Sequence, residues 1–146
     1  MNAATQTDYE HDFYRWTQTQ AALLRQGKLA QADLENIAEE IESMGKSDKR
    51  AISSYLHNIL LHLLKWQYQS SRRSRSWENS IDNNRRQVER ITMDSPSLHA
   101  QIPDLIVAEY ALARRSASRQ TRLPLTTFPE ICPFSTEQVT GDYWPA

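Results

Sequence analysis

The sequence predicts an all-α protein, folded as a single-domain bundle of four to five mostly antiparallel, up-and-down helices with an irregular tail packed on it. Apolar side chains recur every three or four residues through most of the 146-residue chain, which is the spacing of one helix face. Only three glycines occur, and four of the six prolines lie in the last quarter. We expect one domain over residues 1–146, with a core bundle at about 8–120 and a docked tail at about 121–146.

The first expected helix covers residues 9–26. Thr7 and Glu10 match a capping box at its start, and Gly27 is placed to end it in the left-handed conformation. Large side chains recur at helical spacing and form its inner stripe, which consists of Tyr9, Phe13, Trp16, Gln20 and Leu24.

The second expected helix covers residues 31–44, and Gly45 is expected to end it in the same way. Asp33 and Glu40 should point largely to solvent. The apolar face of this helix consists of Leu34, Ile37, Ala38, Ile41 and Met44.

The third expected helix, residues 48–68, is the most apolar and should be the central one. A fourth is expected over residues 77–93, with Ser76 as its N-cap and Asn84 in its buried seam. Its opposite, solvent-facing side should carry charged residues, namely Arg85, Arg86, Glu89 and Arg90.

A fifth helical stretch is expected to begin with Ser95 and Pro96 as N-cap and first residue and to reach about residue 119. Pro103 should kink or break it. In the tail, Ser135 and Gln138 can cap one short turn. The aromatic residues expected to dock the tail onto the bundle are Phe128, Phe134, Tyr143 and Trp144.

The cysteine content and the lack of long apolar segments indicate the cellular compartment. Cys132 is the only cysteine, so no internal disulfide can form, and a lone thiol fits a reducing compartment. Residues 1–7 are polar and lack the apolar core of a signal peptide, and no run of 18 apolar residues occurs. We therefore expect a soluble cytoplasmic protein that does not enter a membrane.

Charge is distributed unevenly although the net charge is only −1. Residues 1–48 hold nine acidic and four basic side chains, whereas residues 49–90 hold nine basic and three acidic ones. Either these segments fold against each other or the basic one faces an acidic partner. Near neutrality makes a dedicated nucleic-acid binder the weaker prediction.

The connector at residues 69–76, QSSRRSRS, is the first candidate site. Arg72, Arg73 and Arg75 could bind an anion or a partner, with Trp77 stacking beside them and the start of the next helix adding N–H donors. The alternative is internal: the arginines form ion pairs with Glu39 and Glu42 while Trp77 lies in the core.

No metal, cofactor or nucleophile site is predicted. Helical di-metal sites use an E-x-x-H pair, which does not occur here, and His57 and His62 do not share a helix face. His62 is expected to be a satisfied histidine at the edge of the core. Cys132 has no histidine near it in sequence and should be inert. No phosphate-binding glycine loop or hydrolase signature occurs.

Four stretches give the chain a family resemblance. They are DFYRWTQTQAALLRQG at 12–27, DLENIAEEIESMGKSDKR at 33–50, LLHLLKWQYQSSRRSRSW at 60–77 and LPLTTFPEICPFSTEQV at 123–139. With DSPSL at 94–98 they span nearly the whole chain, and their order resembles the bacterial DUF29 family, a domain of unknown function. The resemblance implies an all-helical protein, prominent in cyanobacteria and proteobacteria. It implies no activity, cofactor or catalytic residue.

The function favoured by these observations is a non-enzymatic helical module that binds a protein partner or itself, or one member of a two-component pair. One alternative is a small enzyme for phosphorylated or nucleic-acid substrates, with Arg72, Arg73 and Arg75 binding phosphate and Glu39 or His62 as acid or base. Another is nucleic-acid binding without catalysis. Whether the chain is an enzyme stays open at this level.

Overall fold

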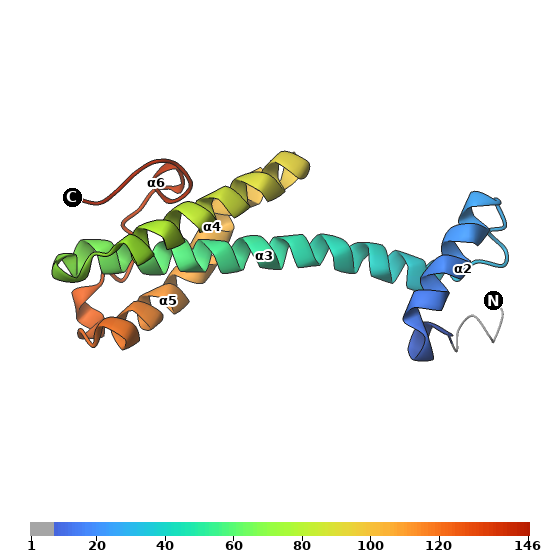
Figure 1. Cartoon of the computed structure of the whole chain (residues 1–146), viewed down its shortest axis with the longest axis horizontal. Helices are drawn as coiled ribbons and strands as arrows, with labels where there is room; N and C mark the ends of the chain where they lie inside the picture. Colours follow the sequence, from blue (N-terminus) through green and yellow to red (C-terminus); the bar gives the residue numbers. More distant parts are fainter. Residues whose placement is uncertain (1–7) are drawn as a thin grey trace. The chain divides into compact units, whose positions relative to one another are not determined.

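The computed structural model describes residues 8–146, and every regular element in that range is a helix (Figure 1). This confirms the all-α class. Thr7 of the predicted capping box lies outside the described residues. The chain divides into two compact units, one that ends at Ser47 and one that covers Asp48–Ala146. The expectation of one domain over the whole chain stays a prediction.

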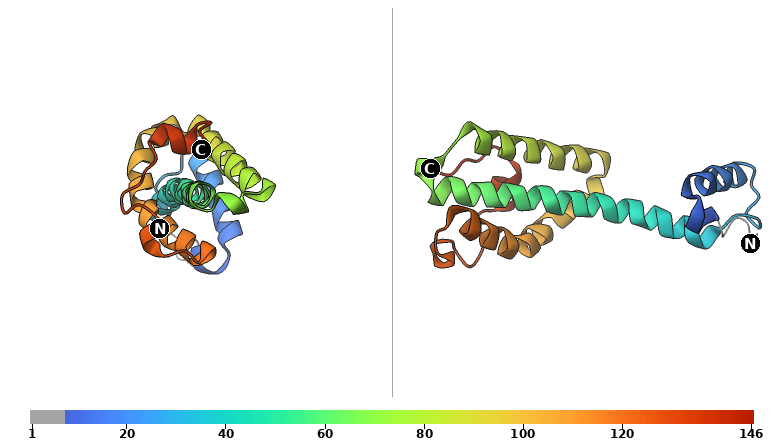
Figure 2. Two further views of the ribbon diagram at one scale, coloured as in Figure 1. Left: turned by 90° about the vertical axis from the view of Figure 1, so that its left-hand side faces the viewer. Right: turned by 60° about the horizontal axis from the view of Figure 1, so that its bottom comes forward.

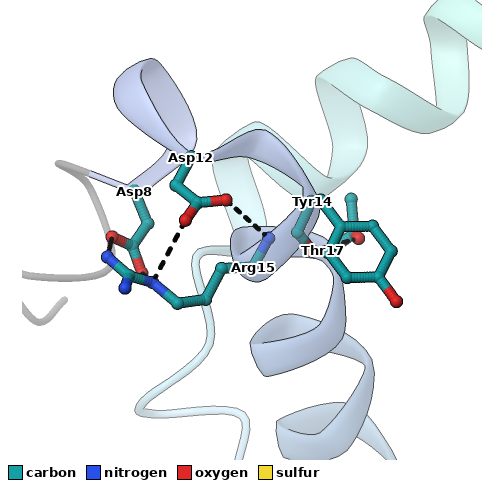
Figure 3. A network of polar contacts seen from close by, with 5 residues as sticks. All are labelled: Asp8, Asp12, Tyr14, Arg15 and Thr17. Atoms are coloured by element: carbon teal, nitrogen blue, oxygen red, sulfur yellow. Dashed lines mark hydrogen bonds and ion pairs between the residues drawn. The ribbon is translucent and has the colours of Figure 1, made fainter.

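In the first unit, the predicted helix at 9–26 is interrupted. Residues 8–11 form one helical turn, and α2 then runs over Phe13–Arg25. Asp12 lies between them as the N-cap of α2, and its carboxylate accepts a hydrogen bond from the Arg15 N–H at 3.1 Å. The Arg15 guanidinium also pairs with Asp8 at 2.6 Å (Figure 3). Asp12 therefore caps α2 and separates it from the helical turn at 8–11, so the predicted single helix is two helical segments.

Gly27 ends α2 as predicted. Its φ is +70°, a conformation in which a side chain would be strained. The Lys28 N–H donates to the Leu23 oxygen at 2.9 Å and the Gly27 N–H to the Leu24 oxygen at 3.1 Å. These two bonds form a Schellman motif, which satisfies the last carbonyls of the helix.

Asp33 was expected in solvent but is completely buried. Its carboxylate accepts hydrogen bonds from Trp16 Nε1 at 3.3 Å and Asn36 Nδ2 at 2.7 Å, and its own N–H donates to Gln20 Oε1 at 2.7 Å. Asp33 directly precedes the next helix, whose free N–H groups favour a carboxylate. Glu40, also expected in solvent, is half-buried and accepts a hydrogen bond from the Tyr9 hydroxyl at 2.6 Å.

The two helices predicted at 31–44 and 48–68 are one helix, α3, which covers Leu34–Tyr68. The prediction that Gly45 ends a helix is therefore wrong. Gly45 does not have a positive φ, and a Cβ added there would meet no atom within 4 Å. A glycine inside a helix costs only about 1 kcal/mol relative to alanine, less than leaving two helix ends without partners.

In the second unit the C-terminal part of α3 runs antiparallel to α4, Arg75–Asp94, and α5, Ile102–Thr121, turns back to run in the direction of α3 (Figure 1). Figure 2 shows α4 and α5 on different sides of this part of α3. The 3-10 turns at Ser70–Arg72 and Pro96–Gln101 connect them. The fully buried centre of the unit includes Ile52, Leu56, Ile59, Leu60, Leu63, Leu64, Ile81, Ala113 and Ala117.

The ends of α4 and α5 differ slightly from expectation. Ser74, not Ser76, caps α4, and its hydroxyl accepts a hydrogen bond from the Trp77 N–H at 3.2 Å. The stretch that begins at Ser95 is broken just before Pro103, which is one of the two predicted outcomes. A 3-10 helix covers Pro96–Gln101, and α5 begins at Ile102 with Pro103 in its first turn, where its missing N–H costs nothing. Asn84 lies in the seam as predicted, and its side-chain oxygen accepts from Asn58 Nδ2 at 3.3 Å.

The tail docks on the second unit as predicted. After α5 it forms a 3-10 turn at Leu125–Thr127 and the short helix α6 at Thr136–Thr140, which begins with the expected capping box of Ser135 and Gln138. Phe128 and Phe134 are buried, and Tyr143 and Trp144 pack against the same core.

Candidate functional site

The arginine connector is partly internal. Arg73 donates to the Trp66 backbone oxygen at 2.9 Å and to an Ala146 backbone oxygen at 2.6 Å, and its guanidinium lies 4.9 Å from the centre of the Trp66 ring. Arg73 therefore holds the end of the tail against α3. The partners of Arg73 within the second unit are backbone oxygens and an aromatic face.

Arg72 and Arg75, by contrast, have exposed side chains. Trp77 is half-buried, with Lys65 Nζ 4.6 Å from its ring centre. Burial lowers the pKa of Lys65 below its usual value. The structure thus separates the three arginines: one stabilises the tail, and two remain free at the surface as candidates for an anion or a partner.

Glu39 and Glu42, the predicted ion-pair partners of the connector, are exposed residues of the first unit. Within the described part of that unit, the ion pairs join Arg15 to Asp8 and Asp12. The pairing of Glu39 and Glu42 with the connector stays a prediction.

Arg85 was placed on the solvent face of α4 and is instead buried, with an exposed fraction of 8%. Its Nε donates to the Val139 oxygen at 2.9 Å, and its Nη2 donates to the oxygens of Gln138 and Tyr143 at 2.8 and 2.7 Å. The Trp144 ring centre lies 5.5 Å away. Arg85 is four residues after Ile81 and three before Val88, so helical spacing alone already placed it on the buried face.

The most unusual surface is on α3. Leu34, Ile41 and Met44, predicted to form a buried face, have exposed fractions of 50%, 58% and 64%. With half-buried Ile37 they follow the 3-4-3 spacing of heptad a and d positions. We call these four residues the α3 stripe. Every residue from Ile41 to Arg50 is exposed.

Charged residues accompany the stripe in an ordered way. Glu35, Glu39, Glu40 and Glu42 lie along its N-terminal part, and Lys46, Lys49 and Arg50 follow on the next two turns. All except Glu40 are exposed. Apart from Glu40 these charged residues lie on the side of α3 opposite the stripe, and a helix with one apolar and one charged side is typical of a helix that packs through its apolar side.

Comparison with known proteins agrees with the resemblance seen in the sequence. The model of the family described as "Domain of unknown function DUF29" matches residues 9–144. The chain belongs to the DUF29 family. Neither the search of curated proteins nor the search of solved structures gave a match.

This DUF29 chain has one further polar cluster, which the sequence analysis missed. His57 on α3 lies between two residues of α5: its Nδ1 is 3.5 Å from Glu109 Oε2, and its Nε2 is 3.5 Å from the Ser116 hydroxyl. The order carboxylate, imidazole, hydroxyl is that of a hydrolase triad. A hollow of about 430 Å³ opens beside Ser54, Asn58, His57 and Glu109, and Ser116 is not part of its wall. The hydroxyl that would attack therefore does not face the hollow, which makes the cluster a poor catalytic site.

Two other reactive side chains of the DUF29 chain, His62 and Cys132, are partly buried and contact backbone oxygens. The His62 Nδ1–H donates to the Asn58 oxygen at 2.8 Å, and burial lowers the pKa of His62 below its usual value. Burial raises the pKa of the Cys132 thiol, which contacts the Phe134 oxygen at 3.5 Å. Among residues 8–146, no three His, Cys, Asp or Glu side chains are grouped as a metal would require.

None of the helices in residues 8–146 combines the length and the apolar character needed to span a bilayer.

Proposed function

We propose that this DUF29 chain is a non-enzymatic interaction module that binds a protein partner through the α3 stripe. The observation that carries the proposal is the exposure of Leu34, Ile41 and Met44 in heptad register on one helix. Single exposed apolar side chains are common on protein surfaces, but a row of large ones at interface spacing marks a place where another helix packs.

The uncovered length of α3 supports the same proposal. Residues 41–50 are all exposed and include Gly45, a poor helix former. Isolated helices shorter than about 12 residues are marginal in water, and most helical stability comes from packing of an apolar face. A partner on the stripe would supply the packing that this stretch lacks.

The arrangement of the connector does not favour phosphate chemistry. Arg73 already binds two backbone oxygens and the Trp66 ring, so the predicted phosphate clamp would lack its central side chain. The exposed pair Arg72 and Arg75 remains available as a secondary contact for an acidic partner.

Site-specific photo-crosslinking in the native host tests the proposal. A photo-reactive amino acid replaces Met44 in one variant and Val107, another exposed apolar residue on α5, in the control. We expect a crosslinked product of defined mass from position 44 but not from 107, and its loss when Ile41→Glu is added. Crosslinking that is absent at 44, or equal at both positions, would refute the proposal.

A further inference from the structure

We propose that the hollow between α4 and the segment around α6 binds a small zwitterion, namely an α-amino acid with an apolar side chain. The inference concerns the second unit and does not depend on the α3 stripe. It follows from three observations: a buried arginine with an unused guanidinium nitrogen, a set of opposite charges that do not pair with one another, and an apolar wall beside them.

The hollow has the size of a small-ligand site. Its volume is about 280 Å³, and α4 lines one side while four residues between Thr140 and Trp144 line the other. A second hollow of about 330 Å³ adjoins it and shares Arg85, Glu89 and Asp142 with it. Small-ligand sites in proteins begin at roughly 300 Å³. We call the two adjoining hollows the α4–tail site.

Arg85 brings an anion-binding group to the α4–tail site. It is buried, and its Nε and Nη2 donate to three backbone oxygens of the tail. Its third nitrogen, Nη1, makes no hydrogen bond within residues 8–146, and Arg85 lines both hollows. Donors on a largely buried group require an acceptor. A ligand carboxylate would supply that acceptor, with the exposed guanidinium of Arg86 as the second cation.

The carboxylates at the site do not neutralise these arginines by direct pairing. Three acidic residues also line the hollow, namely Asp82, Glu89 and Asp142. On α4 the acids and the arginines are three or four residues apart, which is the spacing of helical ion pairs. In the described part of the chain, however, the ion pairs join other side chains. Three carboxylates and two guanidinium groups therefore line one hollow without pairing.

A ligand that carries both charges suits such a wall. A simple anion would be repelled by the three carboxylates, and a simple cation by the two guanidinium groups. Burial lowers the pKa of Arg85 while Asp82 and Asp142 raise it, so both carboxylates lie within electrostatic range of the guanidinium. An α-amino acid has its carboxylate and its ammonium group on the same carbon. The carboxylate can bind Arg85 and Arg86 while the ammonium group binds Asp82 or Asp142.

The second hollow provides a place for the side chain of the amino acid. Its wall includes Val88 and Ile102, which are 2% and 1% exposed. Covering this apolar wall with an apolar side chain removes both surfaces from water, which is favourable. The site should therefore prefer a medium-sized apolar amino acid to glycine, which has no side chain to place there.

Isothermal titration calorimetry of the full-length protein tests the proposal, with L-leucine, L-methionine, L-phenylalanine and glycine as probes. We expect at least one apolar amino acid to bind and glycine to bind more weakly. The amine and the acid that correspond to the tightest probe then separate the two charges; for leucine these are isoamylamine and isocaproate. Each should bind about 10- to 100-fold more weakly than the amino acid, because one charged hydrogen bond contributes about that factor.

Matched variants test the location of the site. Arg86→Gln and Asp82→Asn each remove one charge from the hollow, and both residues are exposed, so the fold is retained. We expect each variant to weaken binding about tenfold. Arg90→Gln and Asp94→Asn change exposed charges of the same helix that line neither hollow, so the affinity should stay unchanged. Circular dichroism checks the fold of all four variants.

Three results would overturn the proposal. The first is the absence of binding by all three apolar amino acids. The second is an amine or an acid that binds as tightly as the amino acid, which would indicate a plain cation or anion site. The third is an affinity that Arg86→Gln and Asp82→Asn leave unchanged. None of these results involves the α3 stripe, so crosslinking at Met44 tests the proposed function separately.

Discussion

At the residue scale, Arg85 joins the tail to α4. Its guanidinium donates to three backbone oxygens of the tail, those of Gln138, Val139 and Tyr143, and it lies near the Trp144 ring. Burial lowers the pKa of Arg85, but the shift begins from a value far above neutrality, so the group stays charged. The planar guanidinium carries several N–H donors, so one arginine can bond several carbonyl oxygens that converge from one segment.

Replacing Arg85 therefore destabilises the second unit. Arg85→Ala leaves buried carbonyl oxygens without donors, and we expect the free energy of unfolding to fall by about 2–4 kcal/mol. Arg86→Ala, at the neighbouring exposed position, should change it by less than about 0.5 kcal/mol. Urea unfolding of both variants measures the difference, and equal losses would show that Arg85 does not hold the tail.

His62 gives the protein a predicted dependence on pH. Its folded pKa is lowered mainly by burial, so the unfolded chain binds a proton at that site more readily than the folded chain. The stabilisation that His62 contributes is present above its unfolded pKa of about 6.5 and is lost as pH falls through the folded pKa.

Thermal unfolding at several pH values measures this effect. The melting temperature should fall as pH is lowered from 7 to 5, and His62→Gln should make that fall shallower. His99→Gln, which alters an exposed histidine, should leave the pH dependence unchanged. A pH dependence that is the same in all three proteins would contradict the role assigned to His62.

At the element scale, Gly27 and Gly45 show where sequence patterns decide a helix end and where they do not. Both follow an amphipathic run, and both were predicted to end a helix. Gly27 has the left-handed conformation with the two Schellman hydrogen bonds, whereas Gly45 is an interior residue of α3. The difference lies in the backbone after each glycine: residues 29–32 form a turn and a bend, whereas the helix continues through Gly45 although Ser47 and Asp48 follow it.

Substituting alanine at the two positions should have opposite effects. Gly45→Ala should stabilise the protein by about 0.5–1 kcal/mol, because the site has helical space for a Cβ. Gly27→Ala should destabilise it by about 1–2 kcal/mol, because alanine is strained at φ +70°. Urea unfolding measures both changes, and a loss of stability in Gly45→Ala would contradict a continuous α3.

Much of the remaining fold could be predicted from periodicity and caps. The capping box of Ser135 and Gln138, the seam position of Asn84 and the docked tail aromatics all follow local rules. Arg85 was missed because charge was given more weight than its spacing from Ile81 and Val88. Asp33 was missed because its hydrogen-bond partners Trp16 and Gln20 come from another helix.

The candidate surface was only partly predictable. Periodicity identified the apolar face at Leu34, Ile41 and Met44, but it cannot tell a face covered by the chain's own core from one left open for another molecule. The arginine connector was predicted as one anion or partner site, yet Arg73 donates to backbone oxygens of Trp66 and of the distant tail. Which distant backbone oxygens an arginine contacts depends on tertiary packing, which the local sequence does not specify.

At the scale of the whole molecule, the acidic and the basic segments of the chain belong to different structural units. The acidic stretch lies on a unit whose buried residues are few, namely Trp16, Gln20, Ala32 and Asp33, and two of these are polar. The second unit has a continuous apolar core of its own. Units of about 40 residues seldom bury enough apolar surface to be stable without added support. A partner on the α3 stripe would supply that support.

Amide hydrogen exchange over residues 34–50, measured for the full-length protein alone and together with the partner crosslinked at position 44, tests this central claim most directly. If a partner covers the stripe, protection of these amides should increase on binding and should not increase in the Ile41→Glu, Met44→Glu variant. Protection around Ile59 and Leu63, in the core of the second unit, should stay constant. Equally fast exchange over residues 34–50 with and without the partner would contradict the account.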